Sequence, residues 1–496
     1  MIAALLSSKH RQVLYALYSA LQNCWGAKTM GKQKLNIKDL STINFPSAVA
    51  KSLSLNIMNR QFKHLPNEEK LTLIQSVLQH PEGFLGDAQL SLLAYKIYKV
   101  PVDERFKSYE LNNRPKHFDV FGSKHIEMNA VKQMELVMRL PIAIRGALMA
   151  DAHQGYGIPI GGVLATKNEV LPYGVGMDIG CRMALSILDL PGSYVEHHAY
   201  EIKKVLQEHT HFGNDGGLDS KPDHQVLVDK TFQETALLKK LHGKAARQLG
   251  SSGSGNHFVE FGIIQVENEN NLGLHAGSYA AILSHSGSRS LGANIAQHYT
   301  DIAMNQCKLP REAKHLAWLS LDSAAGQEYW LSMNLAGQYA KACHDVIHET
   351  ICRALNVDVH RTIENHHNFA WKENLDDGEY IIHRKGATPA ANGVCGIIPG
   401  SMTAPGYVVS GLGNKASLNS AAHGAGRKMS RMKAKNSVTM SSLKKELQSR
   451  KVTLIGGSPE EAPCAYKDIE LVMSSQSTLV NIEAKFHPRI VRMAKD

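Results

Sequence analysis

The sequence predicts an α+β protein, with a large mixed body of β-sheets flanked by helices and a mostly helical N-terminal region. Short apolar runs of strand length lie between longer stretches with helical spacing, and glycine-rich polar loops separate them. No repeat period runs through the 496 residues. With 43% hydrophobic and 20% charged residues, the chain has the composition of a globular protein.

The first 115 residues form a predicted helical accessory region. Asn67, Glu68 and Glu69 mark a helix start, and apolar residues follow at helical spacing. Residues 88–100 predict a second helix that ends before Pro101. Neither segment carries residues that suggest chemistry, so we expect a packing or docking role for residues 1–115.

Residues 116–496 form the predicted main body. A helical pattern over residues 128–140 precedes several glycine-punctuated loops, which are the usual places for functional sites on a rigid scaffold. The tail ends in a strand-like alternation at Val480, Ile482, Ala484 and Phe486. Further strands are predicted at residues 184–188, 258–266, 380–382 and 407–409.

Charge and cysteine content narrow the class of protein. A net charge of +10 favours a polyanionic partner such as nucleic acid. Seven scattered cysteines argue against a disulfide framework or a zinc ribbon and fit a reducing cytosol. No apolar run approaches the roughly 18 residues of a membrane span. We therefore expect a soluble, cytoplasmic protein with no membrane partner.

Five residues predict a metal site. Asp178 and Cys181 lie three apart in a glycine-flanked loop, and His257, His285 and His367 lie in similar loops. Carboxylate, thiolate and imidazole are transition-metal ligands, and five are too many for one closed tetrahedral zinc site. They suit two ions bridged by the thiolate. Taken singly, each residue has an ordinary alternative role, and the ligand types admit zinc, cobalt or iron as readily as manganese.

The segment 423–427 is the strongest candidate for chemistry. His423 is followed by Gly424, Ala425 and Gly426, and a basic run that predicts a helix begins at Arg427. Glycine amides can approach a ligand closely, and a helix N-terminus favours an anion. The alternative is a histidine that only caps a turn.

A second group of residues is consistent with a purine nucleotide. A carboxylate such as Glu260 can accept hydrogen bonds from N1 and the amino group of guanine, and residues 399–402 supply amides and a hydroxyl. In a regular strand Asn256 and Glu260 share one face and His257 the other, so all three reach one site only if the strand starts after His257. No Walker A or plain GxGxxG motif is present. With no suitable acidic nucleophile, His423 is the best candidate for a covalent phosphoramidate.

Residues 427–451 carry nine Lys or Arg and one acidic residue, Glu446. This segment is either a solvated helix face or a track for RNA or DNA phosphates. The composition leaves both interpretations open.

Together these motifs resemble the RtcB family of RNA-splicing ligases from about residue 120 to the C-terminus. Seven motifs match in family order, at residues 151–161, 175–181, 253–258, 367–368, 384–387, 399–402 and 423–427. The resemblance implies that residues 116–496 are a ligase catalytic domain acting in RNA repair or tRNA splicing. Such an enzyme joins RNA ending in a 2′,3′-cyclic phosphate or 3′-phosphate to a 5′-hydroxyl, using GTP and Mn²⁺. It also implies an archease-like activator as a candidate partner.

The resemblance implies roles for individual residues. Asp178, Cys181 and His257 would hold one Mn²⁺, and Cys181, His285 and His367 the second. His423 would be the catalytic nucleophile that forms a histidine–GMP adduct. The implied GTP/GMP contacts are Asn256, His257, Phe258, Val259, Glu260, His367, Asn368, Pro399, Gly400, Ser401, Met402, Gly406, His423, Gly424, Ala425, Gly426 and Lys495.

The sequence also departs from the family pattern. Gly406 replaces a serine that contacts GMP, Arg182 follows Cys181 where glycine is common, and residues 1–115 have no counterpart. Two alternative functions therefore remain. One is a divergent metal-dependent phosphohydrolase that processes RNA ends, and the other is an RNA- or ribosome-associated binding protein that has lost ligation.

Overall fold

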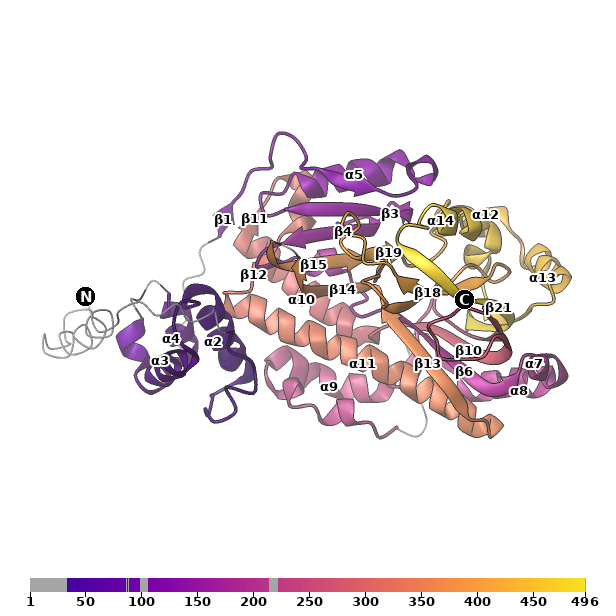
Figure 1. Ribbon diagram of the computed structural model, residues 1–496, viewed down its shortest axis with the longest axis horizontal. Coiled ribbons are helices and arrows are strands. Elements are labelled where there is room, and N and C mark those ends of the chain that lie inside the picture. The colour runs from indigo at the N-terminus through magenta and orange to yellow at the C-terminus, as the bar shows by residue number, and fades with distance from the viewer. Residues whose placement is uncertain are drawn as a thin grey trace, which may run out of the picture.

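The computed structural model describes residues 34–85, 87, 89–98, 106–213, 222–375 and 377–495. Two main sheets form its centre, with helices around them (Figure 1). The larger sheet has eight strands in these ranges; seven follow the order β13-β6-β10-β9-β21-β18-β17, and β20 pairs with β21. Their bounds are β6 (Arg182–Pro191), β9 (Phe258–Val266), β10 (Gly277–Ser286), β13 (Val359–His366), β17 (Cys395–Ile398), β18 (Gly406–Gly411), β20 (Thr453–Gly457) and β21 (Val480–Lys495).

The second sheet has the order β14-β15-β4-β3-β2. Its strands are β2 (Phe118–Val120), β3 (Arg145–His153), β4 (Ile160–Thr166), β14 (Asn368–Leu375) and β15 (Gly378–Lys385). Short strand pairs join loops at the edges of the body: β1 (Lys107–Ser108) with β11 (Cys307–Lys308), β5 (Glu169–Val170) with β12 (Leu319–Ser320), β7 (His211–Phe212) with β8 (Ser251–Ser252), and β16 (Ala387–Pro389) with β19 (Ser420–Ala422).

Helices cover both sheets. The 32-residue α11 (Ala324–Leu355) runs lengthwise beside them (Figure 1). The Ser323 side chain caps its first turn, and Asn356 ends it in a left-handed conformation. The other helices of the body are α5 (Met128–Met138), α6 (Pro172–Val175), α7 (Ser193–His197), α8 (Ala199–His209), α9 (Ala236–Gln248), α10 (Arg289–Gln306), α12 (Arg431–Ser437), α13 (Met440–Ser449) and α14 (Ile469–Ser474).

The helices α2 (Ala48–Gln61), α3 (Asn67–Gln79) and α4 (Ser91–Tyr98) form a separate small core that includes Leu53, Ile74 and Leu93. Polar contacts attach this core to the body: the Arg60 guanidinium lies 3.0 Å from Asp322, and the Lys96 ammonium 2.7 Å from Glu328. The division of the chain at residue 115 stays a prediction.

The predicted fold class is confirmed, with helices and strands largely where the sequence placed them. Helix α3 begins at Asn67, β9 spans residues 258–266, and the tail forms β21. The helix predicted over residues 88–100 appears as α4, and both of its predicted ends lie outside the described residues. Among the described residues, no helix is long and apolar enough to cross a bilayer.

One helix prediction was wrong in its start. The basic run forms two helices, α12 and α13, and the first begins at Arg431 rather than Arg427. Gly426 has a left-handed φ of 71°, and Arg427 is held in a bridge to Tyr466, which keeps it out of a helix. The Ser430 side chain then accepts a hydrogen bond from Lys433 N–H and sets the true start.

Candidate active site

Strand register brings four of the predicted ligands together at one end of four neighbouring strands of the large sheet. Cys181 immediately precedes β6, His257 precedes β9, His285 lies next to the end of β10, and His367 follows β13. The register pairs His285 with Met183 and with Phe258, and pairs His366 with Arg182. Because these antiparallel neighbours start and end at the same level, the four side chains meet.

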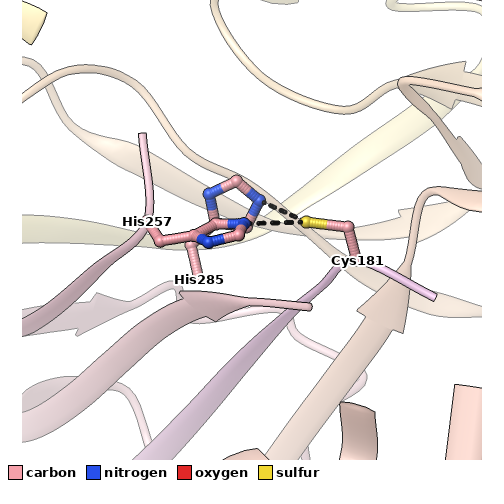
Figure 2. A group of neighbouring side chains, drawn as sticks. All are labelled: Cys181, His257 and His285. Atoms are coloured by element: carbon pink, nitrogen blue, oxygen red, sulfur yellow. Dashed lines mark hydrogen bonds between the residues drawn. The ribbon is translucent and has the colours of Figure 1, made fainter. Parts of the chain in front are cut away.

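The predicted ligands converge on Cys181. Its Sγ lies 3.4 Å from His257 Nε2 and 3.1 Å from His285 Nε2, and Figure 2 shows both rings directed at the sulfur. The chain of contacts extends on either side, since Asp178 Oδ2 lies 3.1 Å from His257 Nε2, and His367 Nε2 lies 3.3 Å from His285 Nε2. The sulfur thus contacts two of the five residues directly, and Asp178 and His367 each contact one of those two histidines.

The charge states fit metal ligation. Burial lowers the pKa of His285 to about 3 and that of His367 well below its usual value, so both imidazoles are neutral bases near pH 7. His285 Nδ1 contacts the Asn256 carbonyl at 3.0 Å, which leaves the Nε2 lone pair for the cluster. Burial alone would raise the pKa of Asp178, but the hydrogen bond and charge of His257 hold it below its usual value.

Among the described residues, the neighbouring cation Arg182 does not offset the effects that keep the Cys181 thiol protonated. Burial, and then the charge of Asp178, raise the pKa of Cys181 well above its usual value. A bound transition-metal ion would supply the missing positive charge, because a coordinating thiol is deprotonated outright. This donor set of one carboxylate, one thiolate and three imidazoles therefore fits such an ion.

Glycines make room for the cluster. A Cβ at Gly287 would lie 2.0 Å from an Asp178 carboxylate oxygen, and one at Gly253 would lie 1.8 Å from His257 Nδ1. Arg182, which stands where the family that the sequence resembles commonly has glycine, is buried. Its guanidinium donates to Glu364 at 3.0 Å and to the Gly337 carbonyl at 3.1 Å, tying β6 to β13 and α11.

His423 lies beside this cluster, with its ring centroid 4.9 Å from that of His367. Its Nδ1 lies 2.6 Å from Asp151 Oδ2, and its backbone N–H donates to the same oxygen at 3.1 Å. Asp151 is fully buried in β3. Since Nδ1–H donates to the carboxylate, the lone pair is on Nε2, the nitrogen that is free to act as a nucleophile.

A cavity of about 1020 Å³ is lined both by the predicted metal ligands and by predicted nucleotide contacts. It is lined by the five metal candidates and by most of the predicted nucleotide contacts, namely Asn256, Phe258, Glu260, Asn368, Pro399, Gly400, Ser401, Met402, Gly406, His423, Gly424, Ala425 and Gly426. Asn256 and His257 precede β9, so the condition on the strand start is met. Burial raises the pKa of Glu260 in this cavity to about 8.

Two predicted contacts are not among the residues that line this cavity. Val259 is buried in an apolar cluster with Phe261 and Ile282, and Lys495 is exposed at the end of β21. A Cβ at Gly406 would have ordinary contacts, 3.5 Å from Pro399 Cα, so nothing in the structure explains the loss of the serine.

Sequence reasoning missed three residues in and around the site, namely Asp151, which holds His423, and Lys385 and Glu461, which line the cavity. Asp151 and Lys385 lie inside recognised motifs, and that position was the only signal for them. Burial lowers the pKa of Lys385 to about 8, and its Nζ donates to the carbonyls of Tyr156 and Tyr173. Glu461 carried no signal. It is buried, and it binds Arg427 at 2.8 Å and Arg431 at 3.3 Å at the cavity wall.

Comparison with known proteins agrees with this arrangement. The sequence model of the family described as tRNA-splicing ligase RtcB matches residues 133–236 and 194–494. RNA-splicing ligase RtcB of Escherichia coli strain K12 is 30% identical over 391 residues, covering 72% of this chain and 92% of that protein. RNA-splicing ligase RtcB homolog 2 of Entamoeba dispar is 31% identical over 435 residues, covering 73% and 83%.

The chain belongs to the RtcB family. A third relative, tRNA-splicing ligase RtcB of Nanoarchaeum equitans, is 29% identical over 441 residues, covering 75% of this chain and 92% of that protein. The family match contains every residue that lines the cavity except Glu127. The helices α2 to α4 lie outside it, so the RtcB match covers the site and not the N-terminal core.

Proposed function

We propose that this chain is a GTP- and Mn²⁺-dependent RNA ligase that joins 2′,3′-cyclic phosphate or 3′-phosphate ends to 5′-hydroxyl ends through a histidine–GMP intermediate. The observation that carries the proposal is the single cavity that holds His423, oriented by Asp151, next to the cluster around Cys181. RNA repair or tRNA splicing is the proposed setting.

In the proposed first step, His423 Nε2 attacks the α-phosphorus of GTP. The new N–P bond forms as the bond to pyrophosphate breaks, while Asp151 holds the proton on Nδ1. A 3′-phosphate oxygen of RNA then displaces Nε2 and takes up GMP, after water has opened any cyclic phosphate. Finally the oxygen of the 5′-hydroxyl attacks the RNA phosphorus and its proton passes to water, so that the phosphodiester bond forms as the bond to GMP breaks.

Two sets of residues would hold the metals: Asp178, Cys181 and His257 for one, and Cys181, His285 and His367 for the other. When bound, Mn²⁺ would neutralise phosphate charge and orient the attacking oxygen. Because Cys181 must remain a free thiolate to serve both sets, the proposal fits a reducing compartment such as the cytoplasm. Dependence on an archease-like activator remains a prediction.

Incubation with α-labelled GTP and Mn²⁺ tests the proposal. The protein should acquire an acid-labile, alkali-stable label and should then join a 3′-phosphate RNA to a 5′-hydroxyl RNA. Metal-dependent opening of a cyclic phosphate without any label would instead favour the phosphohydrolase. RNA binding with neither activity would favour the binding protein.

Asp151→Asn should slow guanylylation by about 10²–10⁴-fold, because loss of the carboxylate releases the imidazole from its orientation and tautomer. The measurement is the single-turnover rate of label incorporation. Affinity for GMP should change less than about threefold, because Asp151 contacts the histidine and is not among the residues that line the cavity. A normal rate would show that the Asp151–His423 contact has no part in catalysis.

Guanine binding should strengthen as pH rises. With a pKa of about 8, Glu260 is mostly protonated at pH 7, and only the carboxylate accepts from both N1–H and the amino group. Between pH 7 and 8.5 the affinity for GMP should rise roughly eightfold, as the ionised fraction rises. Fluorescence titration of a labelled GMP without metal measures it. In Glu260→Gln the dependence should vanish, and an unchanged dependence there would exclude Glu260 as its source.

A further inference from the structure

The helices α12 and α13 present a strongly basic surface beside the cavity. We define the basic surface as Lys433, Lys435, Lys444, Lys445, Arg450 and Lys451, all of which are exposed. Residues 427–451 hold nine basic residues and one acidic residue, a net charge of +8 in a chain whose total is +10. Most of the excess charge of the protein is therefore concentrated in this one segment.

The basic surface is fixed in place by an apolar underside. Leu443 and Leu447 of α13 are buried in a cluster with Met402, Val491 and Met493. Met402 belongs to the cavity wall, and Val491 and Met493 belong to β21. The basic side chains are thus held at a set position relative to the cavity, at the end of the molecule far from α2–α4 (Figure 1).

The first turn of α12 reaches the cavity. Arg431, the first residue of α12, lines the cavity and lies 3.4 Å from Asn256 Oδ1. Arg427 and Arg431 share the single carboxylate of Glu461. Further along the segment, five basic residues form no ion pair with any described residue: Lys433, Lys444, Lys445, Arg450 and Lys451.

Such a surface recognises phosphates and not bases. Residues 427–451 contain no Phe, Tyr or Trp on which a base could stack. Unneutralised lysines and arginines displace counterions from a nucleic-acid backbone, and this gives sequence-independent, salt-sensitive binding. Residues 427–451 could be a solvated helix face or a track for phosphates. Because they are packed against the wall of the cavity, we favour the phosphate track.

We propose that the basic surface binds the phosphate backbone of the RNA strand whose end occupies the cavity. This inference rests on the proposed RNA-ligase function and adds where the body of the RNA lies. The strand would leave the cavity past Arg431 and run along α12 and α13, and its binding would be independent of sequence.

The test compares two fourfold variants of equal charge change. The first replaces Lys444, Lys445, Arg450 and Lys451 by Gln. The control replaces four exposed residues of α9 by Gln, Lys239, Lys240, Lys244 and Arg247, which do not line the cavity. The probes are a fluorescein-labelled 20-nucleotide RNA and a 3-nucleotide RNA, both with a 3′-phosphate, titrated at 50–300 mM salt without GTP.

The first variant should bind the long RNA at least about tenfold more weakly at 100 mM salt. Its salt slope, log Kd against log salt, should fall by up to about 3, since each RNA phosphate that is no longer neutralised lowers the slope by about 0.7. The control should keep the parent slope, and binding of the short RNA should be the same in all three proteins. Equal slopes in the two variants would overturn the proposal.

Guanylylation by GTP separates this inference from the function on which it rests. The first variant should incorporate label from GTP at the parent rate, because the four substituted residues do not line the cavity. A parent protein that binds RNA through this surface but never acquires label would refute the ligase proposal alone. A protein that acquires label but binds long RNA equally well after substitution would refute the surface alone.

Discussion

His423→Ala should incorporate no acid-labile label from GTP and should join no RNA ends. The substitution removes the only nitrogen that we assign as nucleophile, and the buried carboxylate of Asp151 cannot take its place because it is not among the residues that line the cavity. Removing a covalent catalyst that initiates every turnover is expected to lower the rate by at least about 10⁴-fold. Gel analysis after incubation with α-labelled GTP and Mn²⁺ measures it.

Two further measurements make this result specific. His298→Ala changes an exposed histidine on α10, and it should be labelled like the parent. Since His423 is outside the five predicted ligands, His423→Ala should also bind Mn²⁺ with the parent stoichiometry in calorimetry. Label at full level in His423→Ala would mean that another residue carries the GMP, and the assignment of the nucleophile would be wrong.

Cys181→Ala should lose both Mn²⁺ binding and guanylylation, the latter by at least about 10³-fold. The sulfur is the contact shared by His257 and His285, so its removal would take a ligand from both of the proposed ions at once. Loss of an outer-shell partner already costs about 10–100-fold, and loss of a bridging ligand should cost more. Calorimetric titration with Mn²⁺ and the labelling assay measure the two effects.

The fold should survive this substitution, because the β6 ladder begins at Arg182 and alanine fits where the cysteine was. Circular dichroism and the melting temperature of the apoprotein check it. Cys464→Ala, at an exposed cysteine, is the matched control and should behave like the parent. Near-normal labelling in Cys181→Ala would refute the two-metal assignment.

Local pattern was sufficient for much of the fold. The start of α3 at Asn67, the full extent of β9 and the final strand β21 follow from charge, apolar alternation and length. The start of α12 did not follow, because Arg427 is held by Glu461, which lies 34 residues further along the chain. A contact between residues so far apart in the chain cannot be predicted from local helix propensity.

The candidate site, like the fold, was predictable from the sequence only in part. Ligand types and loop context in the sequence were sufficient to propose Asp178, Cys181, His257, His285 and His367, but not the contacts among them. Those contacts depend on β6 pairing with both β10 and β13, a register set by residues far apart in the chain. The contact between Asp151 and His423 was not predictable, because the two residues lie 272 positions apart and Asp151 stands between two buried alanines of β3.

The position of His367 has a mechanical consequence. It is the single residue between β13 of one sheet and β14 of the other, whereas Cys181, His257 and His285 belong to the larger sheet alone. A small displacement of one sheet relative to the other would therefore move the His367 imidazole away from Cys181, His257 and His285. A metal ion held by His367 together with ligands of the larger sheet would link the two sheets, and we expect its binding to raise the melting temperature of the protein.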